Sequence, residues 1–169
     1  MASMRDIKRR QTSVQSTGQI TKAMKLVSTV KLQKARGRAE NTKPYFDGMY
    51  STVASILARS GNIKHRFLKA DTENKKKAVI VITSNRGLAG GYNSNVVKLI
   101  TNNPEFSKEN TVIYTVGRKG QEALLRKGYT VAKDYSECVE EPIYSDAMEM
   151  SRDVLNAFAE GEIGEIYLA

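Results

Sequence analysis

The chain is poor in the residues that build disulfide frameworks and zinc sites. Its 169 residues include one cysteine, one histidine and no tryptophan. A single cysteine excludes an intramolecular disulfide, and one cysteine with one histidine cannot supply the usual ligands of a zinc site. These absences exclude small disulfide-stapled domains and zinc-finger proteins.

Long apolar runs are missing as well. The sequence contains no stretch of about 18 apolar residues, so no segment is predicted to span a membrane as a helix. The first ten residues, MASMRDIKRR, lack the apolar core of a secretion signal. With 40% hydrophobic and 27% charged residues, the composition is that of a folded globular protein and not of a disordered one.

Acidic residues are scarce at the N-terminal end. Residues 1–43 contain eleven Lys and Arg but only two acidic residues, Asp6 and Glu40, so their net charge is +9. Residues 44–169 contain 16 residues of each sign and are neutral overall. This asymmetry indicates an acidic partner for the basic segment: nucleic acid, an anionic membrane or an acidic protein surface.

The basic segment has the composition of one long helix. Ser3 followed by Asp6 is a capping signal, and good helix formers dominate the residues that follow. Beyond Pro44, apolar residues continue at helical spacing through PYFDGMYSTVASILAR. We predict one helix from about Ser3 to about Arg59, kinked near Pro44, with two separate helices as the alternative. At about 1.5 Å per residue, the single helix would be roughly 85 Å long.

An apolar arc runs along this predicted helix. At 100° per residue, its members fall within about a third of the circumference. The heptad pattern is impure, because Lys34 follows Val27 at the same heptad position. Two interpretations remain: a core-facing helix with a solvated basic face, or half of a coiled coil whose other strand lies elsewhere. The arc consists of Ile20, Ala23, Met24, Val27 and Val30.

Strand and helix patterns alternate in the second half of the chain. The run AVIVITS is typical of a strand buried on both faces of a parallel sheet. Gly128 and Gly161 are placed to end helices, and Ser145 is placed to cap one. Alternation of this kind predicts a Rossmann-like, mostly parallel α/β domain with right-handed crossovers. The predicted strands are 78–84, 111–116, 129–136 and 165–169, and the predicted helices are 93–103, 118–128 and 145–161.

The predicted domain organisation has three parts. Residues 1–59 form the long helix, residues 60–77 form a polar linker, and residues 78–169 form the Rossmann-like domain. The lone His65 in the linker is predicted to be solvated. Because the chain stops within a predicted strand, this domain is expected to be incomplete and a C-terminal portion to be absent.

One glycine-rich turn, TSNRGLAGGYNSN at residues 83–95, follows the first predicted strand. Phosphate binds at this place in many α/β proteins, but neither phosphate-binding fingerprint of glycines fits here. We predict a structural turn that lets a helix pack close to the sheet, with a nucleotide-binding α/β module as the less favoured interpretation. The predicted turn residues are Arg86, Gly87, Gly90, Gly91 and Asn93.

No set of catalytic residues is found. Glu140 and Glu141 are adjacent in a loop and point apart, so they do not form an acid–base pair. The only histidine and the only cysteine lie in different segments. The sequence therefore predicts no catalytic residues, no cofactor and no metal, and it argues against an enzyme that works alone.

Several strings along the chain resemble the gamma subunit of the bacterial F-type ATP synthase. They are MRDIKRR, SVQSTGQITKAMKLVSTVKLQKAR, SNRGLAGGYNSN and VGRKG, in the family's order. In that family, an N-terminal and a C-terminal helix form an antiparallel coiled coil, the central shaft, and a Rossmann-like domain lies between them in sequence. The C-terminal helix has no counterpart here, and Asn85 and Ala89 replace the Asp and Cys common in relatives.

The resemblance implies a non-catalytic central rotor stalk subunit of a proton-translocating ATP synthase, which couples ion-driven rotation to ATP synthesis. Its implied partners are the alpha and beta subunits of the catalytic head, the epsilon subunit and the c-ring. The implied location is peripheral, at the cytoplasmic face of the bacterial plasma membrane, without membrane insertion. Residues expected to contact the catalytic ring are Ile20, Lys22, Met24, Lys25, Val27 and Lys31.

A nucleic-acid-binding protein with a basic helical arm is the alternative function. The net charge favours it, because Lys and Arg neutralise phosphates. Against it, residues 1–44 contain no aromatic side chain on which a base could stack. Nucleic acid is therefore not among the expected partners.

Overall fold

The computed structural model describes residues 3–61, 63, 65–68 and 76–169. The chain divides into two compact units, residues 1–63 and residues 64–169. Much of the predicted linker lies outside the described residues. His65 is described and exposed, as predicted, and its Nδ1 accepts a hydrogen bond from the Phe67 N–H at 3.3 Å.

The first unit consists mainly of one helix, α1, which runs over Met4–Arg59 and contains 56 residues. A capping box begins it, as the sequence predicted. The Arg5 N–H donates to Ser3 Oγ at 3.3 Å, and the Ser3 N–H donates to Asp6 Oδ2 at 3.2 Å. These bonds satisfy N–H groups of the first turn that have no partner within the helix.

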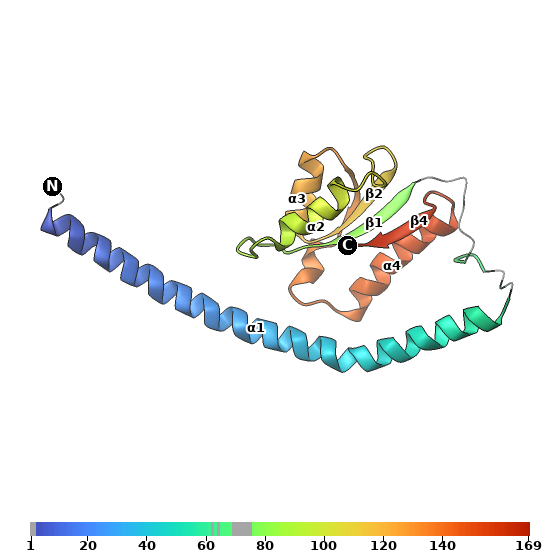
Figure 1. The fold of residues 1–169 in the computed structure, drawn as a ribbon, viewed down its shortest axis with the longest axis horizontal. Coiled ribbons are helices and arrows are strands. Elements are labelled where there is room, and N and C mark those ends of the chain that lie inside the picture. Colours follow the sequence, from blue (N-terminus) through green and yellow to red (C-terminus); the bar gives the residue numbers. More distant parts are fainter. Residues whose placement is uncertain (1–2, 62, 64, 69–75) are drawn as a thin grey trace. The chain divides into compact units, whose positions relative to one another are not determined.

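Pro44 lies inside α1 and does not end it. The alternative of two separate helices is therefore wrong. Proline removes one backbone hydrogen bond and its ring crowds the preceding turn, which bends a helix. Figure 1 shows the axis of α1 changing direction in its cyan part.

The second unit is built on four parallel strands in the order β3-β2-β1-β4. This arrangement confirms the predicted Rossmann-like fold. The helical segments are α2 (Tyr92–Thr101), α3 (Arg118–Arg126), the 3₁₀ turn η1 (Ser136–Val139) and α4 (Tyr144–Ala159). The strands are β1 (Lys77–Ile82), β2 (Thr111–Val116), β3 (Thr130–Asp134) and β4 (Glu165–Leu168).

The core of this unit has two layers, one on each face of the sheet. Val79 and Val81 of β1 pack with buried residues of α2 and α3, including Ile100 and Leu124. Ala78, on the other face of β1, packs in a second cluster with Val154 of α4. The prediction that this strand is buried on both faces is confirmed.

Two of the three helix-end signals are confirmed and one is wrong. Gly128 and Gly161 follow α3 and α4 with φ of 85° and 77°, conformations that glycine adopts without strain. Ser145 does not cap α4, because the helix already begins at Tyr144. Instead, the Ile143 N–H donates to Asp146 Oδ2 at 3.0 Å, so a carboxylate in the first turn performs the capping.

Candidate functional site

The arc of α1 that the sequence singled out is exposed to solvent. None of the described residues of α1 is buried. Ile20, Met24 and Val27 have 58%, 49% and 59% of their surface exposed. Helices in proteins gain most of their stability from packing an apolar side, and α1 buries none of its residues. This favours the interpretation of α1 as one strand of a coiled coil over that of a core-facing helix.

The six predicted contact residues do not share one side of α1. Successive side chains turn by about 100° along a helix. Ile20, Met24, Val27 and Lys31 therefore lie within about 60° of one another. Lys22 and Lys25 project from the opposite half of the circumference. The structure brings four of the six residues together and separates the two remaining lysines from them.

The turn between β1 and α2 is closed at its base by two side chains. Asn93 Oδ1 accepts from the Ser84 N–H at 3.0 Å, and Asn93 Nδ2 donates to Ser84 Oγ at 2.8 Å. Ser84 Oγ lies 2.6 Å from the Arg86 carbonyl oxygen, to which it donates. These bonds join the two ends of the turn.

The three predicted turn glycines, Gly87, Gly90 and Gly91, affect the backbone conformation of the turn and have no side chain to make contacts. Gly90 has φ of 56°, and Gly91 directly precedes α2. A Cβ added at Gly87 would meet nothing within 4 Å, so sterics do not demand glycine there. At the tip, Leu88 adopts φ of 63° and is 91% exposed. A strained, exposed leucine is costly, and it marks this turn as a candidate contact surface.

The turn also occupies the N-terminus of α3, where a Rossmann-like fold could hold an anion. The Gly120 N–H donates to Thr83 Oγ1 at 2.9 Å, and the Arg118 N–H donates to Asn85 Oδ1 at 3.0 Å. The Lys119 N–H donates to the Ser84 carbonyl oxygen at 3.1 Å. Because side-chain and backbone oxygens already accept from these three N–H groups, they are not available to a phosphate.

Thr83, Asn85 and Gly117 are important residues that sequence reasoning missed. Thr83 Oγ1 donates to the Gly117 carbonyl oxygen at 3.0 Å. Gly117 has φ of 115°, and a Cβ there would lie 2.1 Å from the Thr83 carbonyl oxygen. The string VGRKG carried the signal, because only glycine tolerates this approach.

A charge cluster of the α/β unit joins β3 to α4. Lys133 Nζ lies 2.6 Å from Asp153 Oδ2 and 2.7 Å from Glu149 Oε1. Tyr135 donates its hydroxyl hydrogen to Asp153 at 2.7 Å. Hydrogen bonds from Lys133 and then from Tyr135 lower the pKa of Asp153 below its ordinary value. The arrangement holds α4 on the sheet and leaves Asp153 ionised, which does not suit a general acid.

The described residues offer neither a metal-ion cluster nor a membrane-spanning helix. Among the described residues, no group of three or more His, Cys, Asp and Glu side chains is arranged to hold a metal ion. No helix in the described part of the chain combines the length and the apolar character needed to cross a bilayer.

The fold defines a class: an α/β protein with a four-stranded parallel sheet and a long helical arm. A profile of the ATP synthase family matches residues 3–169. The chain belongs to the ATP synthase gamma chain family.

Two relatives illustrate the similarity. The ATP synthase gamma chain of Lachnoclostridium phytofermentans is 66% identical over 169 residues, which are 100% of this chain and 57% of that protein. The sodium ion specific gamma chain of Acetobacterium woodii is 42% identical over 166 residues, 98% of this chain and 54% of that protein. The chain thus spans just over half the length of these relatives.

Proposed function

We propose that the chain acts in the central rotor stalk of an F-type ATP synthase and couples ion-driven rotation to ATP synthesis. One observation carries this proposal: α1 is a 56-residue helix in which no residue is buried. Such a helix needs a partner along its apolar side, and a shaft inside a ring of subunits has one on every side. Membership of the gamma chain family supports the same function.

The proposed mechanism needs no catalytic residue in this chain. An asymmetric shaft touches each of three alternating catalytic pairs differently and so favours a different conformation at each. Rotation exchanges these preferences, which couples the rotor angle to nucleotide affinity. The subunit itself is therefore proposed to be non-catalytic, without cofactor or metal.

The two sides of α1 suggest two kinds of contact. Ile20, Met24 and Val27 form an apolar side that would pack against a partner helix. Lys22 and Lys25 project the other way and would meet acidic loops of the surrounding head, which gives electrostatic complementarity and register. The same α1 can thereby bind its helix partner and the surrounding head at once.

The proposed partners are the alpha and beta subunits of the head, the epsilon subunit and the c-ring. The proposed location is peripheral, on the cytoplasmic face of the bacterial plasma membrane. We propose the proton as the driving ion. One relative is named sodium ion specific, so ATP-driven pumping should be measured with and without Na⁺. Pumping that requires Na⁺ would contradict the proton assignment.

Met24→Glu and Met24→Lys in the assembled ATP synthase test the function. Met24 is half exposed and lies far from the α/β unit in sequence, so neither variant should unfold that unit. Each variant should alter contacts of the shaft, whose coupling free energy is typically about 1–3 kcal/mol. ATP hydrolysis should then fall less than ATP-driven ion pumping.

The control for this test is Leu125→Glu, which adds the same charge as Met24→Glu at a half-exposed leucine of α3. It should leave the ratio of pumping to hydrolysis unchanged. An equal fall of both activities in the Met24 variants, or no change in either, would remove Met24 from the coupling surface.

A further inference from the structure

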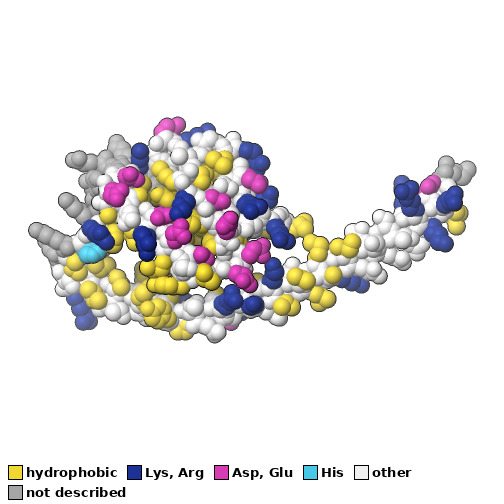
Figure 2. All heavy atoms as spheres, turned by 180° about the vertical axis from the view of Figure 1, so that it is seen from behind, with side chains coloured by type: hydrophobic (Ala, Val, Ile, Leu, Met, Phe, Trp, Pro, Cys, Tyr) yellow, Lys and Arg dark blue, Asp and Glu magenta, His cyan; other side chains and the backbone are white. Residues whose placement is uncertain are grey.

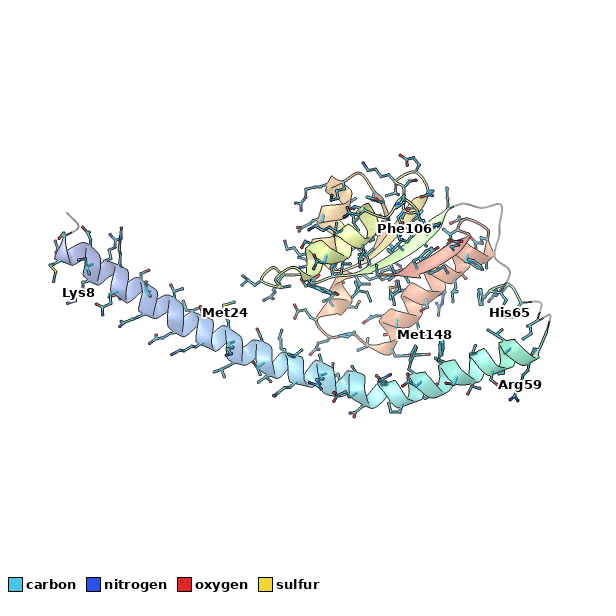
Figure 3. The ribbon with its side chains drawn as sticks, viewed as in Figure 1. Lys8, Met24, Arg59, His65, Phe106 and Met148 are labelled. Carbon is cyan, nitrogen blue, oxygen red and sulfur yellow. The ribbon has the colours of Figure 1, made fainter. Side chains whose placement is uncertain are left out.

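The side of the sheet that α4 covers contains a pocket. Its volume is about 460 Å³, which is within the range of small-molecule sites in proteins. Tyr114 and Ile163, which line the pocket, belong to the core layer that packs with α4. Figure 3 shows α4, on which Met148 is labelled, across the sheet from Phe106 of the other core layer.

Small residues leave the space for this pocket. In β3, Ala132 is an extra residue between the two positions that pair with Ile113 and Tyr114 of β2. Such a β-bulge redirects side chains locally, and bulges are common beside functional sites. Ala132 lines the pocket with a single methyl group, and Gly161 lines it without a side chain.

Tyr114 brings a hydroxyl group to the pocket. Only 7% of this residue is exposed, and the structure gives its hydroxyl no hydrogen-bond partner among the described residues. Buried tyrosine hydroxyls usually find a partner. None of the fully buried side-chain oxygen and nitrogen atoms of the described residues lacks one, so the Tyr114 oxygen opens to the pocket. A ligand in the pocket would supply the missing hydrogen bond.

Glu162 supplies a carboxylate to the same pocket, and backbone hydrogen bonds fix its position. The Glu162 N–H donates to the Ala157 carbonyl oxygen at 2.9 Å, and the Gly161 N–H donates to the Phe158 carbonyl oxygen at 3.2 Å. These bonds hold Glu162 beside the last turn of α4, where the helix end carries a partial negative charge. Glu162 belongs to none of the salt bridges found among the described residues.

The charges that act on the Tyr114 hydroxyl are negative. Burial raises the pKa of Tyr114 most, and the carboxylates of Glu162 and then Asp153 raise it further. The hydroxyl therefore stays neutral and can accept a hydrogen bond through its oxygen. Asp153 is already bonded to Lys133, whereas Glu162 is not. A neutral hydroxyl beside an unpaired carboxylate suits a positively charged N–H donor.

We propose that this pocket binds a small aliphatic amine in its protonated form. The ammonium group donates hydrogen bonds to the Tyr114 oxygen and to the Glu162 carboxylate. The alkyl chain of the ligand lies on the apolar part of the lining, which consists of Val112, Ala132 and Ile163. The pocket contains none of the proposed contact residues of α1, so this proposal can fail without affecting the proposed rotary function.

Butylammonium, a single ammonium group on a short alkyl chain, is the probe that tests the proposal. It is titrated into the full chain with ¹³C-labelled isoleucine and valine methyl groups. The Ile163 and Val112 resonances should shift saturably, with a dissociation constant of about 1–10 mM for so small a ligand. Ile100, which is fully buried in the core layer on the other face of the sheet, should not shift.

Three further ligands separate the chemical features that the pocket recognises. Butanol has the same alkyl chain without a charge, and butyrate has the opposite charge. Neither should shift the Ile163 resonance saturably. Tetramethylammonium carries the same charge as butylammonium but has no N–H donor, so it should bind at least about fivefold more weakly.

Variants test the roles of the lining residues. Glu162→Gln and Tyr114→Phe each remove one partner of the ammonium group and should weaken butylammonium binding about tenfold. Glu160→Gln is the matched control, because it removes the same charge at an exposed position two residues earlier, and it should change binding by less than about twofold. Lys76 also lines the pocket, and Lys76→Gln should strengthen binding, because it removes a charge that repels the ligand. An unchanged Ile100 resonance would show that each variant is folded.

Four results would overturn the proposal. They are an Ile163 resonance that butylammonium does not shift saturably, an equal response to butanol or butyrate, an equal loss of binding in Glu160→Gln and Glu162→Gln, and weaker binding in Lys76→Gln. A response to a lysine-containing peptide but not to butylammonium would assign the pocket to a side chain of a partner protein, and it would also overturn the proposal.

Discussion

The helical arm and the α/β unit differ in whether they bury their apolar side chains. Within the described residues, the sixteen buried hydrophobic residues all lie between Ala78 and Ile163. α1 buries none of its residues, although it contains Ile20, Val27, Phe46 and other large apolar side chains. Figure 2 shows acidic and basic side chains intermixed over the α/β unit, whereas Lys, Arg and apolar side chains follow α1.

This difference separates stability from function along the chain. The α/β unit has a two-layered core of its own, so its fold depends on residues within it. α1 keeps its apolar side for another molecule or segment, so its residues should matter for assembly more than for folding. Matched substitutions in the two regions should therefore have different effects on stability.

The largest difference is expected for leucine truncation. Leu124→Ala removes a side chain that is fully buried and should cost about 2–5 kcal/mol of unfolding free energy. Leu26→Ala on α1 makes the same change at a leucine that is 69% exposed, and it should change stability by less than about 0.5 kcal/mol. Urea unfolding of the α/β unit, followed by near-ultraviolet circular dichroism of its tyrosines, measures both. Equal losses of unfolding free energy in the two variants would show that stability does not depend on the α/β unit more than on α1.

Glycine substitutions should have opposite signs in the two regions. Gly117→Ala places a Cβ 2.1 Å from a carbonyl oxygen at φ of 115° and should destabilise the unit by about 2–3 kcal/mol. Gly18→Ala meets no atom within 4 Å inside a helix, and it should stabilise α1 by up to about 1 kcal/mol. Thermal denaturation shows the first change and far-ultraviolet circular dichroism the second. A tolerated Gly117→Ala would contradict the packing of Thr83.

The ion pairs of the two regions should differ less in their contribution to stability, and this difference should depend on pH. Asp153 faces Lys133, Tyr135, Glu149 and Arg152, and its lowered pKa stabilises the fold above the ordinary carboxyl range. This stability is lost as the pH falls through the lowered pKa. Asp153→Asn should therefore cost about 1 kcal/mol at pH 7 and progressively less below about pH 4. Urea unfolding across this pH range measures it, and a loss independent of pH would contradict the assignment.

The matched control for Asp153 lies on α1. Glu40 pairs with Arg36 at 2.7 Å, and both side chains are mostly exposed. Glu40→Gln should cost less than about 0.5 kcal/mol at any pH. If Glu40→Gln cost as much unfolding free energy as Asp153→Asn, the exposed ion pair on α1 would contribute as much stability as the ion pair between β3 and α4.

Much of the fold could be predicted because its signals are local. The run TVIYTV was predicted as residues 111–116, and β2 has those bounds. Gly128 and Gly161 end helices because their positive φ depends on the residue itself. Ser145 is not the cap because α4 begins at Tyr144, and the carboxylate of Asp146 accepts from the N–H of Ile143, two residues before Ser145.

The features that the sequence analysis missed depend on contacts between distant residues. The bonds of Thr83 to Gly117 and of Asn85 to Arg118 each span more than 30 positions. No periodicity reveals such pairs. The separation of Lys22 and Lys25 from the apolar side needs no such long-range contact. It follows from the turn of about 100° per residue in any α-helix, so the sequence alone was enough to predict it. The roles of the predicted contact residues and of the turn residues remain proposals.

Hydrogen exchange with and without the catalytic head subunits tests whether α1 needs a partner to be stable. In the free chain, amides of residues 5–40 should be weakly protected, whereas those of residues 78–116 should be strongly protected, because only the second region has a buried core. Adding the head should raise protection along α1 and leave residues 78–116 unchanged. Strong protection of α1 in the free monomer, or no change in its protection when the head is added, would show that α1 does not depend on a partner for its stability.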